Sequence, residues 1–138
     1  MRDIEFRAKA INREEGQEYR TSYKNGDWVY GLITKRKDEY SCATMTNTNG
    51  ISNIDVDEYT LCQYIGRKDK NGTKIYEGDL VKFTDSNYPM LIRWVKGCAK
   101  FVFFDLVCEV NVDIWNKLTD ECEIIGNIFD TPEIAEVV

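Results

Sequence analysis

Short apolar runs, separated by residues that favour turns, dominate the hydrophobic pattern of this chain. The first run alternates, because Ile4, Phe6 and Ala8 are apolar whereas Glu5 and Arg7 between them are charged. A period of two is typical of a β-strand with one face on a core and one face in water. No 11-residue stretch shows the apolar stripe of an amphipathic helix. The pattern therefore predicts a mainly β protein.

Further strand candidates recur at a spacing typical of a small antiparallel barrel or sandwich. Each is rich in aromatic or β-branched residues and is bounded by turn formers. One helical turn is predicted over 55–59, where acidic residues suit a helix N-terminus, and another after Thr131 and Pro132, as N-cap and first helical residue. The further strand candidates cover residues 19–23, 28–33, 40–45, 64–65, 75–76, 80–83, 90–95, 100–104, 106–112 and 124–129.

The turn signals are densest in the middle of the chain. Asn71-Gly72 is the preferred pair for a type I′ turn, in which both central residues need positive φ. We therefore predict a β-hairpin whose arms are 64–65 and 75–76. Glu77-Gly78-Asp79 predicts a second turn that leads into the strand at 80–83.

Length and composition indicate one soluble globular domain. The 138 residues are 43% hydrophobic and 30% charged, and two subregions, 1–60 and 61–138, are suggested without any linker composition between them. The chain shows neither the apolar core of a signal peptide nor a run long enough to span a bilayer, so we expect a cytoplasmic protein. The net charge of −6 argues against nucleic acid as the main partner, because such binding depends on neutralising phosphates.

The cysteines and the absence of histidine narrow the possible chemistry. The five cysteines are widely spaced and, without an export signal, are interpreted as reduced and mostly buried. No spacing supports a zinc site, and catalysis by Ser-His or Cys-His pairs in their usual forms is excluded. We therefore expect no cofactor, no metal and no enzymatic activity.

Several segments of the sequence together match a known pattern, and these are residues 1–8, 29–31, 63–81 and 125–129, followed by Pro132 and Glu133. They resemble the YopX family of small proteins encoded by phages and prophages. The resemblance implies a phage-derived cytoplasmic protein that self-associates, and it carries over no catalytic residue. Lys9 and Asp57 depart from the family, whose members often have Trp and Pro there.

The predicted hairpin also carries the candidate binding residues. Basic side chains surround its tip, only Asp69 opposes them, and aromatic rings lie at its base. Such a group suits single-stranded nucleic acid or an acidic protein surface, although charged hairpin tips are commonly just solvated. The candidates are Tyr64, Arg67, Lys68, Lys70, Lys74 and Tyr76.

Two other groups have competing interpretations. Glu77 and Asp79 could bind a cation or exchange protons, but Asp79 could equally accept hydrogen bonds from turn amides. Trp28, Trp94 and Trp115 are expected mainly in the core, although any one could anchor an interface.

Three hypotheses follow, in order of preference. The first is a non-enzymatic protein-interaction module that binds a host or phage protein and self-associates. The second is a nucleic-acid-binding accessory protein that uses the basic hairpin, and the remote third is a metal-dependent enzyme built on Glu77 and Asp79.

Overall fold

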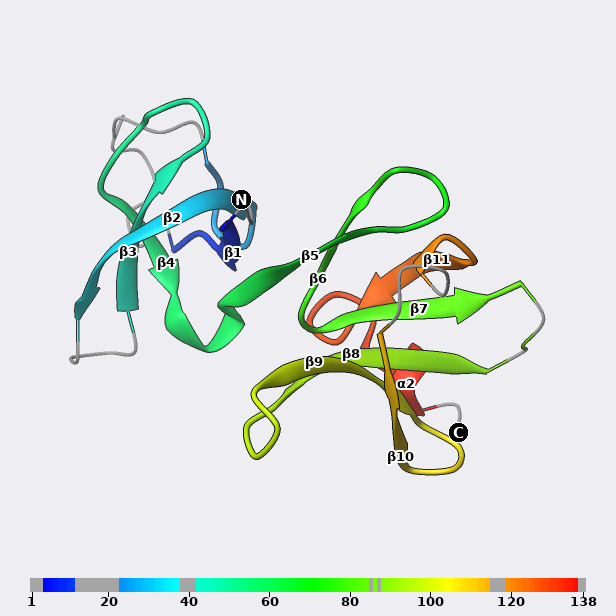
Figure 1. Cartoon of the computed structure of the whole chain (residues 1–138). Helices are drawn as coiled ribbons and strands as arrows, with labels where there is room; N and C mark the ends of the chain where they lie inside the picture. The colour runs from blue at the N-terminus through cyan, green and yellow to red at the C-terminus, as the bar shows by residue number, and fades with distance from the viewer. Residues whose placement is uncertain are drawn as a thin grey trace. The chain divides into compact units, whose positions relative to one another are not determined.

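The computed structural model describes residues 4–11, 23–37, 42–84, 86, 88–114 and 119–136. These residues form two sheets in which every strand pair is antiparallel, with little helix, so the mainly β prediction is confirmed (Figure 1). The strands are β1 (Phe6–Lys9), β2 (Trp28–Lys37), β3 (Cys42–Asn47), β4 (Ile54–Asp57), β5 (Cys62–Lys68), β6 (Lys74–Tyr76), β7 (Asp79–Phe83), β8 (Pro89–Val95), β9 (Lys100–Asp105), β10 (Val110–Asp113) and β11 (Cys122–Asn127). The helices are the 3₁₀ turn η2 (Glu58–Thr60) and α2 (Pro132–Glu136).

The chain divides into two compact units, Met1–Gln63 and Tyr64–Val138. The six-stranded sheet has the order β4-β3-β2-β1-β5-β6, and the five-stranded sheet has the order β10-β9-β8-β7-β11. Strand β5 begins in the first unit, where it pairs with β1, and ends in the second, where it pairs with β6. Within the described ranges, no helix is long and apolar enough to cross a lipid bilayer.

In the first unit the sheet closes on itself. Beyond β1, Ala10 forms a bridge with Val56 of β4, and the Ile11 amide donates to the Asp55 carbonyl at 2.8 Å. The hydroxyl of Thr60 in η2 accepts the Lys9 amide at 2.8 Å and so spans the gap between β4 and β5. The enclosed core consists of Ala8, Ala10, Val29, Ala43, Met45, Ile54 and Val56.

The second unit has its own core, which lies between the β5–β6 hairpin and one face of the five-stranded sheet. Phe103 is completely buried at its centre, and the Phe83 ring meets it edge-on with centroids 5.1 Å apart. Strands β7, β8 and β9 each place one residue in this core, namely Val81, Ile92 and Phe103. The residues two positions away on the same strands, Phe83, Met90 and Phe101, pack against it, as the period of two requires. The core consists of Ile65, Ile75, Val81, Ile92, Phe103 and Cys122.

Several sequence predictions shift locally. The expected strand at 106–112 is wrong over its first part, because residues 106–109 form a turn and β10 begins at Val110. The Asp105 carboxylate accepts the amides of Val107 and Cys108 and so stabilises this turn. The same two bonds lower the pKa of Asp105. Segment 55–59 is divided between β4 and η2, and the expected strand at 19–23 lies almost wholly outside the described residues.

The cysteines and tryptophans are less uniformly buried than expected. Cys62 and Cys122 are buried, but Cys98 and Cys108 are exposed, and all four are free thiols. Trp94 is 44% exposed and packs edge-on against Phe101, whereas Trp115 lies outside the described residues.

Close strand approach at Gly31 generates the first testable prediction. A β-carbon at Gly31 would overlap the backbone of β3 at the Thr46 carbonyl oxygen. We expect Gly31→Ala to lower the free energy of unfolding by about 1–3 kcal/mol, measured by urea denaturation. Gly97→Ala is the matched control, because a methyl group there would meet no described atom within 4 Å and should change stability by less than about 0.5 kcal/mol. Equal losses in the two variants would contradict this account of Gly31.

Candidate binding surface at the β5–β6 hairpin

The hairpin of β5 and β6 forms as predicted, but its arms are not regular. Tyr64 pairs with Tyr76, and Lys68 pairs with Lys74. Between these two pairs, β5 contains two more residues than β6 does. Gly66 lies in the resulting bulge with φ of +86°. Glycine fits there because other residues rarely adopt positive φ without strain.

The turn at the tip is not the predicted type I′ turn. The Asp69 amide donates to the Thr73 carbonyl, and the Gly72 amide donates to the Asp69 carbonyl, which leaves a loop of three residues, 70–72. Gly72 has φ of +80°, whereas Asn71 does not have positive φ. Three-residue hairpin loops commonly combine a type I turn with glycine in the left-handed region. The Asp69 carboxylate decides the outcome, because its Oδ1 accepts the amides of Asn71 and Thr73, each at 2.9 Å.

The tip is joined to the outer edge of β11. The Ile124 amide donates to the Asp69 Oδ2 at 3.1 Å, and the Lys70 amide donates to the Cys122 carbonyl at 2.9 Å. The Lys70 ammonium lies 3.6 Å from the Glu123 carboxylate across the same edge. Burial raises the pKa of the Cys122 thiol to about 11, and the negative charge of Asp69 adds to the effect. The hairpin tip therefore closes a sheet edge that would otherwise be open to other strands.

The two aromatic candidates are buried together. Tyr64 and Tyr76 are 7% and 2% exposed, and their ring centroids lie 5.7 Å apart at an angle of 45°. The Lys74 ammonium lies 5.3 Å from the centroid of the Tyr64 ring, a cation–π distance. Because these rings are buried, they offer little face on which a nucleic-acid base could stack.

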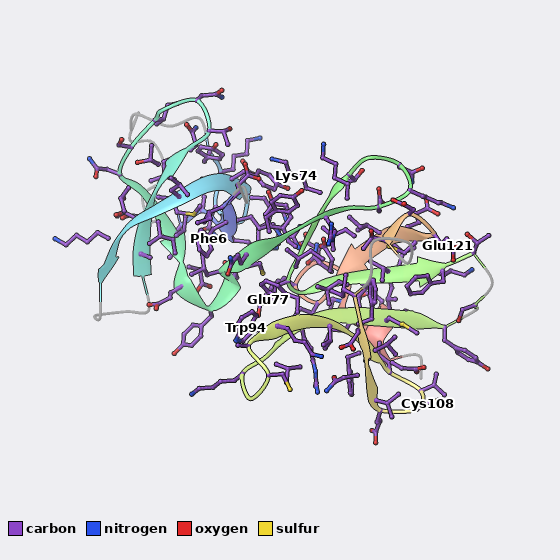
Figure 2. The ribbon with its side chains drawn as sticks, in the orientation of Figure 1. Phe6, Lys74, Glu77, Trp94, Cys108 and Glu121 are labelled. Atoms are coloured by element: carbon purple, nitrogen blue, oxygen red, sulfur yellow. The ribbon has the colours of Figure 1, made fainter. Side chains whose placement is uncertain are left out.

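The basic candidates do not form one cluster. Lys74 covers the Tyr64 ring, Lys70 reaches β11, and Arg67 and Lys68 are exposed at the bulge end of β5. Lys74 begins β6, whereas Glu77 follows the last residue at the other end of that strand (Figure 2). The structure thus brings together Tyr64, Lys74 and Tyr76, and separates Lys70 from them.

Of the two carboxylates proposed for cation or proton chemistry, Glu77 lies in the turn after β6 and Asp79 is the first residue of β7. Asp79 is 1% exposed, and its Oδ2 accepts the Tyr76 amide at 2.8 Å. Gly78, with φ of +86°, bonds through its amide to the Ile92 carbonyl and through its carbonyl to the Ile128 amide. The described part of the chain holds no group of three or more His, Cys, Asp or Glu residues suited to a metal ion.

The family model of the YopX protein matches residues 5–136. The chain belongs to the YopX family. The match includes the hairpin, its turn and the strand that follows, and it confirms the resemblance found in the sequence. No curated protein matches the chain.

A second exposed surface was missed by sequence reasoning. Strand β2 turns Val29 towards the core, and its neighbours Trp28, Tyr30 and Leu32 lie on the opposite face. Tyr30 and Leu32 are 39% and 51% exposed. The signal was present in residues 28–33, because a strand that is apolar at consecutive positions presents apolar side chains on both faces.

Cations from β1 lie beside this face. The Arg7 guanidinium carbon is 4.5 Å, and the Lys9 ammonium 5.2 Å, from the centroid of the Trp28 ring. Register explains the grouping, since Lys9 pairs with Trp28 and Arg7 with Tyr30. We call Lys9, Trp28, Tyr30 and Leu32, together with the largely buried Arg7 (7% exposed), the outer β1–β2 face.

The role of the buried carboxylate at the hairpin tip can be tested by mutation. Asp69→Ala would leave three backbone amides without their acceptor, so we expect unfolding free energy to fall by about 2–4 kcal/mol in urea denaturation. Glu123→Ala removes an exposed ion pair with Lys70 and a long, exposed hydrogen bond from the Asn71 side-chain amide, and it should cost about 0.5 kcal/mol or less. Similar losses in both variants would contradict the assignment of the edge closure to Asp69.

Proposed function

We propose that this protein is a phage- or prophage-encoded, non-enzymatic protein-interaction module that acts in the cytoplasm of the bacterial host and self-associates. The observation that carries the proposal is the outer β1–β2 face, where Tyr30 and Leu32 are exposed beside Trp28. Tyrosine and tryptophan dominate binding hot spots because they bury a large area with little loss of side-chain entropy. A partner protein would gain that apolar burial.

The face is also well positioned for recognition. Its residues project from adjacent strands, β1 and β2, whose register is continuous over four pairs from Phe6–Gly31 to Lys9–Trp28. A sheet holds side chains more precisely than a loop does. The Trp28 ring is further held by the cations of Arg7 and Lys9, which adds cation–π stabilisation.

The non-enzymatic part of the proposal has positive support in the second unit. Asp79, one of the two carboxylates that could have served as an acid or base, accepts a backbone amide and is almost fully buried. The buried Cys122 thiol has its pKa raised to about 11, which disfavours the thiolate needed of a nucleophile.

An affinity pull-down from host lysate, with and without nuclease, tests the proposal. We expect a specific protein to be recovered in both samples and its recovery to fall about tenfold or more with Tyr30→Ser/Leu32→Thr. Tyr59→Ser is the matched control, since Tyr59 is a 79% exposed tyrosine on η2, outside the outer β1–β2 face. Recovery of the bait alone, or equal recovery with all variants, would contradict the proposed surface.

A second candidate function is binding of single-stranded nucleic acid, favoured by the exposure of Arg67 and Lys68. If both contact phosphates, Arg67→Ala/Lys68→Ala should reduce the slope of log K against log salt by about 1.4, measured by fluorescence anisotropy. Lys82→Ala/Lys96→Ala removes two exposed lysines elsewhere and serves as the control. The absence of any binding at low salt would eliminate this candidate.

A further inference from the structure

The strands at the ends of the sheets differ in the hydrogen bonding of their outer edges. The edge of β4 is bonded by Ala10 and Ile11, and the edge of β11 is bonded by Asp69 and Lys70. Strand β10 ends the five-stranded sheet, and β9 is its one strand neighbour in the described part of the chain. Two edges are thus closed by specific hydrogen bonds, whereas among the described residues no second strand pairs with the outer edge of β10.

Strand β10 is only four residues long and ends on the charged Asp113, but it lacks the other features that protect an edge. It contains neither lysine nor proline, and its register with β9 runs through four consecutive pairs without a bulge. Val110 is 50% exposed, and Val107 in the preceding turn is 42% exposed. A bulge-free edge with exposed β-branched residues is a template for another strand.

We propose that β10 is the self-association surface, and that it pairs antiparallel with β10 of a second copy about a two-fold axis. The pairing would join two five-stranded sheets into one continuous sheet, and a self-complementary patch is what a two-fold dimer requires. This inference rests on the self-association included in the proposed function, and it assigns that association to one strand.

The side chains favour one register, with Val112 opposite the partner's Val112. In this register Val110 lies opposite the partner's Ile114, on the face where Val112 and Ile114 pack beside the core of the second unit. Asn111 lies opposite the partner's Asp113 on the other face, where an amide can donate to a carboxylate. A register centred on Asn111 would instead place Glu109 against the partner's Asp113, and like charges that face each other are destabilising.

The dimer should be weak and depend on concentration. Each copy contributes only a strand of four residues and the adjoining turn. We expect the area that they bury to be smaller than the roughly 800 Å² per partner of a standard stable interface. Light scattering and sedimentation equilibrium over a concentration series are the appropriate measurements.

The test is a double-mutant cycle that changes the charges of Asn111 and Asp113, which lie opposite each other across the proposed dimer. Asn111→Asp keeps an acceptor for the Arg93 Nε, which lies 3.2 Å from the Asn111 Oδ1, but it sets two carboxylates against each other twice in the dimer. We expect the dissociation constant of the full chain to rise about fivefold. Adding Asp113→Asn restores an amide–carboxylate pair and should return the constant to within about twofold of the unmodified protein. That second change also removes an exposed ion pair with Lys100, whose contribution to folding is small.

Asn49→Asp is the control, because it adds the same charge at an exposed turn of the first unit. Backbone amide exchange provides a second readout, and the amides of 110–114 should become slower to exchange as the protein concentration rises. Dimers that tolerate Asn111→Asp, without such protection, would overturn the assignment to β10 while leaving self-association intact. A protein that stays monomeric would overturn both the assignment to β10 and self-association. If the β10 amides become slower to exchange only when another protein is bound, β10 pairs with a strand of that protein and not with a second copy.

Discussion

The buried carboxylate of Asp69 is the interaction on which the second unit depends most. One oxygen accepts two amides of its own turn, and the other accepts the amide of Ile124 on a strand more than fifty residues later. A carboxylate that accepts several amides replaces the water it loses on burial, so its desolvation is offset. The turn at the hairpin tip and the closure of the β11 edge therefore depend on the same side chain.

The first unit meets the same requirement with a hydroxyl. Its sheet curls until the residues after β1 reach β4, and η2 lies where β4 gives way to β5. The Thr60 hydroxyl accepts the Lys9 amide and donates to the Asp57 carbonyl at 2.7 Å, so neither backbone group is left without a partner. In both units a polar side chain satisfies the backbone where a regular ladder cannot.

Edge closure changes how the basic hairpin is understood. In the sequence it is a group of cations beside aromatic rings, but the rings are buried against each other and Lys70 is directed to β11. Exposed apolar side chains lie away from the hairpin, and they include Tyr30 and Leu32 of the outer β1–β2 face and Val110 of β10.

The sequence by itself determined the mainly β class, the positions of most strands and turns, and the family, because these depend on local pattern. The alternation at Ile4–Ala8 and the turn at Gly78 are examples. Only the tertiary structure decided that Tyr64 and Tyr76 are buried, that Tyr30 is exposed, and that Asp69 reaches Ile124. A period of two states that a strand has two faces, but what covers each face, and what bonds each edge, depends on segments far away in the chain.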